Sequence, residues 1–226
     1  MNPVLFSQAG IATQILLDNV LVDVGDGTLR DLLAVSYDFQ TLDTILITHG
    51  HYDHMGGLHS LLGYLRMIGH TTPLNIFHPG ACEVDAVITG FKTCYQDTIP
   101  YPMIITIVED RKPYILSNVV IQPFFVVHAG STAQGVLSPI PAVGYRITFK
   151  DKTVAVTGDS AYCNSLEELV KGADQAFIEA TWTKRRKEML TKKYGDIEKD
   201  MLKVHLSEEQ AHHLGNFARE YTIIHT

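Results

Sequence analysis

The residues of this chain best suited to chemistry lie in one short segment, residues 48–54. It reads Thr-His-Gly-His-Tyr-Asp-His and contains His49, His51, Asp53 and His54, directly after an apolar run that predicts a β-strand. In a loop that leaves a strand, alternate side chains can converge on one ion while the intervening side chains point toward a neighbouring ion. Imidazole nitrogens with a carboxylate suit zinc or a similar divalent metal. We therefore predict a metal site at this strand end.

This segment resembles the His-x-His-x-Asp-His signature of the metallo-β-lactamase superfamily. Further residues of the superfamily pattern follow in order: His128 after the apolar segment 119–127, Asp159 after a predicted strand, and His225 at the end of the last strand. The resemblance implies two neighbouring metal ions. The first would be held by His49, His51 and His128. The second would be held by Asp53, His54 and His225. Asp159 would bridge the two.

The implied activity is hydrolysis by a hydroxide held between two divalent metal ions. Two ions about 3.5–4 Å apart can share a water, lower its pKa, and clamp the attacking and leaving oxygens. Zinc is the default metal, with manganese or iron(II) as alternatives. Asp53 combines its ligand role with a position facing the water, so it would also accept the proton of that water.

Two later segments resemble elements of the ribonuclease Z-like phosphodiesterases: Glu-Ala-Thr at residues 179–181 and His-Leu-Ser at residues 205–207. In that family the histidine contacts the scissile phosphate and protonates the leaving oxygen, and the glutamate orients the histidine. The resemblance implies that His205 is the general acid and Glu179 its partner, since a carboxylate favours and directs an imidazolium. The substrate would then be a phosphodiester, either a small molecule or RNA.

One departure from the ribonuclease Z pattern concerns the grip on tRNA. The short interval between His128 and Asp159 leaves little room for the tRNA-gripping arm that ribonuclease Z often carries there. The net charge of −7 argues against an extensive surface for a polyanion. The basic run 184–187 would hold a few phosphates at most. We therefore expect hydrolysis of small or unstructured phosphodiesters and poor processing of precursor tRNA, unless an oligomer such as a homodimer supplies a grip in trans.

Three other functions stay open at this point. A hydrolase of the same fold could act on a lactone, a thioester or a lactam. A redox protein with a di-iron site would typically carry glutamate at the second histidine of the signature, where this chain has His51. A non-catalytic binding module is disfavoured by the full ligand set, because degenerate members tend to lose ligands.

Strands that alternate with helices must position these residues. Short runs rich in β-branched residues predict strands at 20–24, 44–48, 74–77, 103–108, 119–127, 176–179 and 221–224, and a hairpin at 144–149 and 153–157. Helices are predicted at 58–68, 81–95, 165–170 and 184–202, and from a Ser207 cap to about residue 220. Asp23 is expected in a tight turn, as a carboxylate behind a ligating histidine.

This pattern predicts an α/β protein with mixed sheets. The resemblance refines it to an αββα four-layer sandwich, two mixed β-sheets flanked by helices, in a single domain over residues 1–226.

The overall composition agrees with a cytoplasmic enzyme. The chain has 226 residues, of which 46% are hydrophobic and 19% charged, as in ordinary globular proteins. Its sequence contains neither an apolar stretch of membrane-spanning length nor a signal peptide, so no membrane association is expected. Cys82, Cys94 and Cys163 show no Cys-x-x-Cys spacing and are interpreted as reduced thiols.

Overall fold

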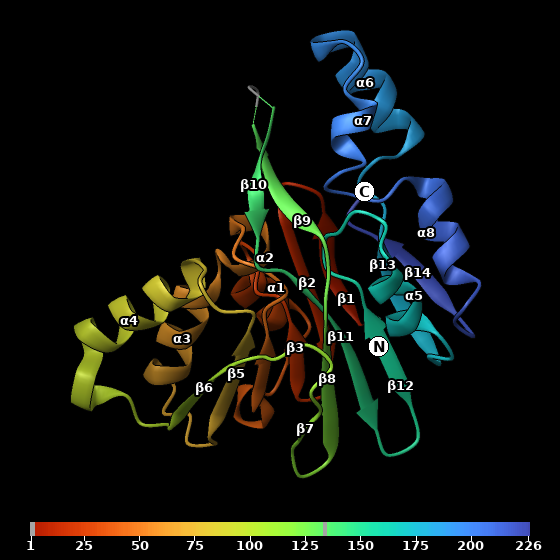
Figure 1. Cartoon of the computed structure of the whole chain (residues 1–226). Helices are drawn as coiled ribbons and strands as arrows, with labels where there is room; N and C mark the ends of the chain where they lie inside the picture. The colour runs from red at the N-terminus through yellow and green to blue at the C-terminus, as the bar shows by residue number, and fades with distance from the viewer. Residues whose placement is uncertain (1–2, 133–134) are drawn as a thin grey trace. The chain divides into compact units, whose positions relative to one another are not determined.

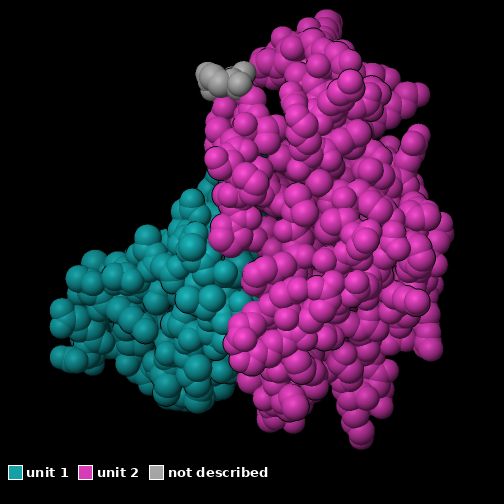
Figure 2. All heavy atoms as spheres, viewed as in Figure 1, with its two compact units in different colours: residues 1–108 teal, residues 109–226 magenta. Residues whose placement is uncertain are grey.

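The chain divides into two compact units, Met1–Val108 and Glu109–Thr226 (Figure 2). Each unit is built around a six-stranded β-sheet. The computed structural model describes residues 3–132 and 135–226. Both sheets are mixed and flanked by helices, which confirms the predicted α/β class. That the two units form one domain stays a prediction.

The sheet of the first unit has the order β1-β2-β3-β4-β5-β6. Its strands are Val4–Gln8, Ala12–Leu17, Val20–Val22, Thr44–Leu46, Leu74–His78 and Met103–Ile107. β1, β2 and β3 pair antiparallel, and β3 to β6 pair parallel. Because β3, β4 and β5 run parallel, the residues that follow them emerge at one edge of the sheet.

Helices of the first unit are α1 (Thr28–Ala34), α2 (Tyr52–Met55), α3 (Leu58–Met67) and α4 (Glu83–Tyr95), with short 3-10 turns at Phe39–Thr41 and Gln96–Thr98. Leucines at 58, 61, 62 and 65 follow the helical period and are fully buried. Figure 1 shows α3 beside α4, whose apolar face packs into the same core. The predicted helix end at Gly69 is confirmed, since this glycine has a left-handed φ of 69°.

The sheet of the second unit has the order β14-β13-β12-β11-β8-β7. Its strands, from β7 to β14, are Tyr114–Ile115, Val119–Phe125, Val143–Phe149, Thr153–Val156, Gln175–Glu179 and Tyr221–Ile224. The predicted hairpin is confirmed as β11 and β12. β12, β13 and β14 run parallel, so their carboxyl ends also share one edge.

Helices α5 (Asn164–Val170) and α8 (Glu208–Gly215) pack their apolar side chains against this sheet. The predicted capping box of Ser207 and Gln210 is confirmed. The helix ends at Gly215 rather than near residue 220, because Gly215 packs directly on the ring of Tyr221 and the chain must turn there to enter β14.

Two further features of the second unit differ from the expectation. The strands β9 (His128–Thr132) and β10 (Gly135–Ile140) form a separate antiparallel pair that the sequence pattern did not predict. The single helix expected over 184–202 is broken into α6 (Lys184–Tyr194) and α7 (Glu198–Met201). Gly195 causes the break by adopting a φ of 81°, which a residue without a Cβ adopts at little cost. In Figure 1 both features extend beyond the same end of the unit's sheet.

Candidate metal centre

The predicted His-x-His-x-Asp-His motif lies at the carboxyl edge of the first sheet. It follows β4, and His51 is the residue before α2, whose first turn contains Asp53 and His54. His49, Asp53 and His54 are buried, and His51 is half-buried. Nε2 of His49 lies 3.0 Å from Nδ1 of His51. Two nitrogens bound to one tetrahedral zinc are about 3.3 Å apart, so this pair fits two ligands of a single ion.

Asp23 sets the orientation of two imidazoles of this motif. Its carboxylate is 1% exposed and accepts hydrogen bonds from Nδ1 of His54 at 2.7 Å and from the Thr48 amide at 2.8 Å. The Thr48 hydroxyl also donates to it at 2.9 Å, and therefore accepts from Nδ1 of His49 at 3.1 Å. Both imidazoles are thereby held in the tautomer that coordinates a metal through Nε2. The predicted contact of Asp23 with a histidine of the motif is confirmed; that this histidine binds a metal stays a prediction.

The backbone also approaches the motif closely. The Gly10 amide donates to Oδ2 of Asp53 at 2.8 Å, and the same oxygen lies 3.9 Å from Nε2 of His54. A Cβ on Gly25 would lie 2.6 Å from the carbonyl oxygen of Asp53, so only glycine permits this contact. The turn between β1 and β2 therefore holds the carboxylate of Asp53, and the turn after β3 packs against its backbone.

Three parallel strands deliver the corresponding residues of the second unit. Asp159 follows β12, Glu179 ends β13, and His225 follows β14. Oδ1 of Asp159 lies 3.3 Å from Nδ1 of His225, and Oδ2 lies 4.0 Å from Nε2 of His128. Nδ1 of His128 donates to the Val204 carbonyl at 2.8 Å, which again directs Nε2 toward the carboxylate. The structure thus brings together the ligands predicted within this unit.

His225 adopts a left-handed backbone conformation, with a φ of 52°, which is uncommon for a residue with a side chain. The Thr181 hydroxyl donates to the carbonyl of His225 at 3.1 Å and lies 2.9 Å from its Nδ1. Asp23 of the first unit is also left-handed, with a φ of 59°. Strained backbone of this kind concentrates at functional sites, where the surrounding contacts maintain it.

Glu179 and His205 form the buried pair that the sequence predicts. Oε1 of Glu179 lies 3.0 Å from Nδ1 of His205 and accepts from the amides of Ser160 and Leu206, both at 3.1 Å. Oε2 accepts from the Thr181 amide at 2.7 Å. Burial disfavours a charged His205, but the charge of Glu179 and its hydrogen bond outweigh burial and raise the pKa of His205 above its usual value.

The donor chemistry of each unit fits a divalent metal. Imidazole nitrogens and carboxylate oxygens are the ligands of catalytic zinc, and nearly all of those here are buried. The donor atoms of His128, Asp159 and His205 lie within 4.8 Å of one another, so His205 lies among the candidate ligands. Thr48 and Thr181, which contact imidazoles of candidate ligands, cannot be recognised in that role from the sequence. Both follow shortly after a strand, next to residues that the sequence does single out.

The family follows from the comparison with known proteins. Residues 18–225 match the family described as Beta-lactamase superfamily domain, so this chain belongs to the metallo-β-lactamase superfamily. None of the helices within residues 3–132 and 135–226 is both long and apolar enough to cross a membrane.

The relatives lie in the ribonuclease Z branch. The chain is 27% identical over 217 residues to the Ribonuclease Z of Bradyrhizobium sp. (strain ORS 278), covering 78% of this chain and 72% of that protein. It is 32% identical over 165 residues to the Ribonuclease BN of Enterobacter sp. (strain 638), covering 70% of this chain and 50% of that protein. The crystal structure of the short form of human tRNase Z has a TM-score of 0.75 at 19% identity, covering 98% of this chain and 91% of that one.

These likenesses confirm the predicted fold and the predicted branch. The match to the human structure shows a metallo-β-lactamase fold, and the curated relatives carry ribonuclease names. Together they support the predicted class of activity, a metal-dependent phosphodiesterase of this fold.

Proposed function

We propose that this chain is a phosphodiesterase that works with two divalent metal ions, zinc by default. The first ion would be bound by His49, His51 and His128. The second would be bound by Asp53, His54 and His225, with Asp159 between the two. Support comes from the fit of the donors within each unit and from the family match over residues 18–225. When bound, the two ions would supply the Lewis acidity that activates water and neutralises charge at the phosphate.

The observation that carries a phosphodiester substrate is the Glu179–His205 pair. Four hydrogen bonds, three of them from backbone amides, hold the Glu179 carboxylate in one orientation. Its bond to Nδ1 of His205 directs Nε2 to the opposite side of the ring. From there Nε2 would donate a proton to the leaving oxygen, a step that an alkoxide leaving group requires most. Asp53, held by the Gly10 amide, would accept the proton of the attacking water.

Hydrolysis of bis(p-nitrophenyl) phosphate tests this function directly. The protein would be stripped with chelator, reloaded with zinc or manganese, and assayed beside a lactone, a thioester and a lactam. We expect metal-dependent hydrolysis of the diester and little of the other three. Preferential cleavage of one of the other three would assign the chain to a different branch of the fold.

Elemental analysis of the same samples tests the two-metal assignment. We expect about two ions per wild-type chain, fewer in His49→Ala, and no change in His59→Ala. His59 is a matched control, because its imidazole is exposed on α3 and packs against the Phe91 ring. A single tightly held ion in the wild type would contradict the assignment.

Substrate size and cellular location complete the proposal. We infer small or unstructured phosphodiesters, RNA included, because the interval between His128 and Asp159 contains only the β9–β10 and β11–β12 pairs among the residues that the structure describes and the net charge is −7. A cytoplasmic location is supported by Cys82, Cys94 and Cys163, which are free thiols.

A further inference from the structure

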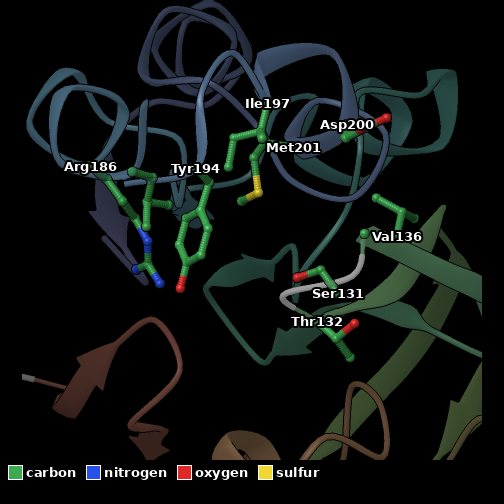
Figure 3. A pocket seen from close by; sticks show the side chains of 10 residues that line it. Ser131, Thr132, Val136, Arg186, Tyr194, Ile197, Asp200 and Met201 are labelled. Carbon is green, nitrogen blue, oxygen red and sulfur yellow. The ribbon is translucent and has the colours of Figure 1, made fainter. Parts of the chain in front are cut away.

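A cavity of about 390 Å³ lies within the second unit, between the β9–β10 pair and the helices α6 and α7 (Figure 3). This volume falls in the range of about 300–1,000 Å³ that small-molecule sites occupy. The side of the cavity formed by the β9–β10 pair carries the hydroxyls of Ser131 and Thr132. The helical side carries apolar side chains from Leu190, Ile197 and Met201. Hydroxyls facing an apolar wall suit an organic ligand with polar substituents.

The cavity contains one positive charge without a counter-charge. Nε of Arg186 is buried and has no hydrogen-bond acceptor among the residues that the structure describes, and no carboxylate of these residues pairs with the guanidinium. The other charged residue of the lining, Asp200, is paired with Lys203 at 2.7 Å. A partly buried guanidinium in this state favours an anion, and phosphate matches its fork of donors.

An aromatic ring lies beside this charge. Arg186, Leu190 and Tyr194 are four residues apart and therefore share one face of α6. Tyr194 is 46% exposed, and Nζ of Lys193 lies 4.8 Å from the centroid of its ring. Figure 3 shows the guanidinium of Arg186 next to the phenol of Tyr194, across the cavity from the β9–β10 pair. Exposed aromatic side chains beside basic groups are the usual platform for a nucleobase.

The cavity adjoins the histidines proposed to act on the scissile phosphate. The Met201 carbonyl, in the cavity wall, accepts from the amide of His205 at 2.9 Å. On the opposite wall, β9 begins at His128 and continues into Ser131 and Thr132. A group held in the cavity would therefore lie next to the phosphate being cleaved.

We propose that this cavity binds one nucleotide unit of the substrate, with Arg186 on the phosphate of that unit and Tyr194 against its base. The proposal rests on the proposed function, because it makes the diester a nucleotide chain rather than a phospholipid or a sugar phosphate. The substrate then carries two phosphates, one at the scissile position and one at Arg186, separated by a nucleoside.

Calorimetric titration with adenosine 5′-monophosphate tests this site, because this nucleotide is a monoester and the proposed reaction cleaves diesters. Arg186→Ala should weaken binding about ten- to a hundred-fold, the effect expected for loss of a charge-assisted bond. Arg185→Ala is the matched control: it removes the same charge from an exposed position on the same helix, outside the cavity lining. It should change affinity by less than about threefold. α6 has no buried residue, so both variants should stay folded.

Two further comparisons separate the charge from the ring. Tyr194→Ala should weaken binding of the nucleotide about ten-fold, whereas Tyr194→Phe should retain it. Adenosine, which lacks the phosphate, should bind wild type and Arg186→Ala alike. Equal losses in Arg185→Ala and Arg186→Ala would overturn the proposal, because the effect would then be long-range charge alone. Binding of adenosine 5′-monophosphate no tighter than that of inorganic phosphate would overturn it as well.

Diesterase assays on the same preparations separate this inference from the proposed function. If wild type binds the nucleotide through Arg186 but hydrolyses no diester, the cavity assignment stands and the proposed function fails. If wild type hydrolyses diesters but Arg186→Ala binds the nucleotide normally, the proposed function stands and the cavity assignment is overturned.

Discussion

Replacing Glu179 by glutamine tests how the second unit orients its proposed general acid. Oε1 of Glu179 accepts from three donors and Oε2 from the Thr181 amide at 2.7 Å. Glutamine has the same shape but only one accepting atom. Its oxygen would stay with the three donors, and its NH2 group would then face the Thr181 amide. One buried donor left without an acceptor costs about 1–3 kcal/mol. At about 2–4 °C per kcal/mol for a chain of this size, Tm should fall by about 2–12 °C.

Glu179→Gln should lower catalysis because it weakens the hydrogen bond that orients His205. A hydrogen bond to a charged group contributes about 1.5–3 kcal/mol and a neutral one about 0.5–1.5 kcal/mol, so Glu179→Gln should lose about 1–2 kcal/mol at His205. That corresponds to a kcat/KM about 5- to 30-fold lower. His205→Ala should lower turnover by about 10²–10⁴-fold, with a larger loss for an alkyl diester than for a nitrophenyl diester. Steady-state kinetics on both substrates would measure these changes.

A double-mutant cycle gives the decisive comparison. In a His205→Ala background, Glu179→Gln should change kcat/KM by less than about twofold, because the group it orients is gone. Glu167→Gln is a control that makes the same substitution at a carboxylate bonded to the Tyr162 hydroxyl at 2.6 Å, and it should leave kcat/KM unchanged. Equal losses in both backgrounds would refute the orienting role of Glu179. A fall in metal content of His205→Ala would instead make His205 a ligand and put His225 in question.

Three other perturbations have defined outcomes. Asp53→Ala should abolish diester hydrolysis while a thermal melt shows the fold largely intact; near-normal turnover would exclude Asp53 from proton transfer. In the wild type, Asp23 accepts a hydrogen bond from Nδ1 of His54 at 2.7 Å, and Asp23→Asn would place an amide there. This change should weaken zinc binding about 10–100-fold in a competition assay with a chromophoric chelator. Unchanged affinity would show that Asp23 does not set the tautomer of His54. Precursor tRNA should be processed poorly relative to bis(p-nitrophenyl) phosphate at physiological salt, and efficient removal of the 3′ trailer would contradict the small-substrate proposal.

The strands that carry the candidate ligands are predictable because their apolar residues are continuous. Parallel strands covered on both faces have short continuous apolar runs, as at Thr44–Leu46, and the polar residues after them stand out. The motif and the strand ends therefore locate His49 and His225 from the sequence alone. The supporting contacts are less visible, since the role of Thr48 depends on Asp23, which comes from a different strand end.

The first two strands and the β9–β10 pair are not predicted because their sequences lack a clear apolar pattern. β2 is buried throughout, yet it contains Thr13 and Gln14. Gln14 is tolerated there because its amide donates to Asp31 at 2.7 Å, a partner that only the folded chain supplies. β9 has the sequence His-Ala-Gly-Ser-Thr and pairs with β10 alone among the described strands. Backbone pairing, rather than an apolar face, defines such a strand.

The break at Gly195 has the largest consequence for function. On one straight helix over 184–202, several side chains would form a continuous stripe along one face: Arg186, Leu190, Tyr194, Ile197 and Met201. Such a stripe is typical of a helix that packs on a core, yet no residue of α6 is buried. The left-handed glycine turns α7 away from the axis of α6, so that both segments contribute walls to one cavity. A straight helix presents a convex surface, and a ligand needs a concave one. A backbone angle that the side-chain pattern does not encode therefore converts a stripe into a candidate binding site.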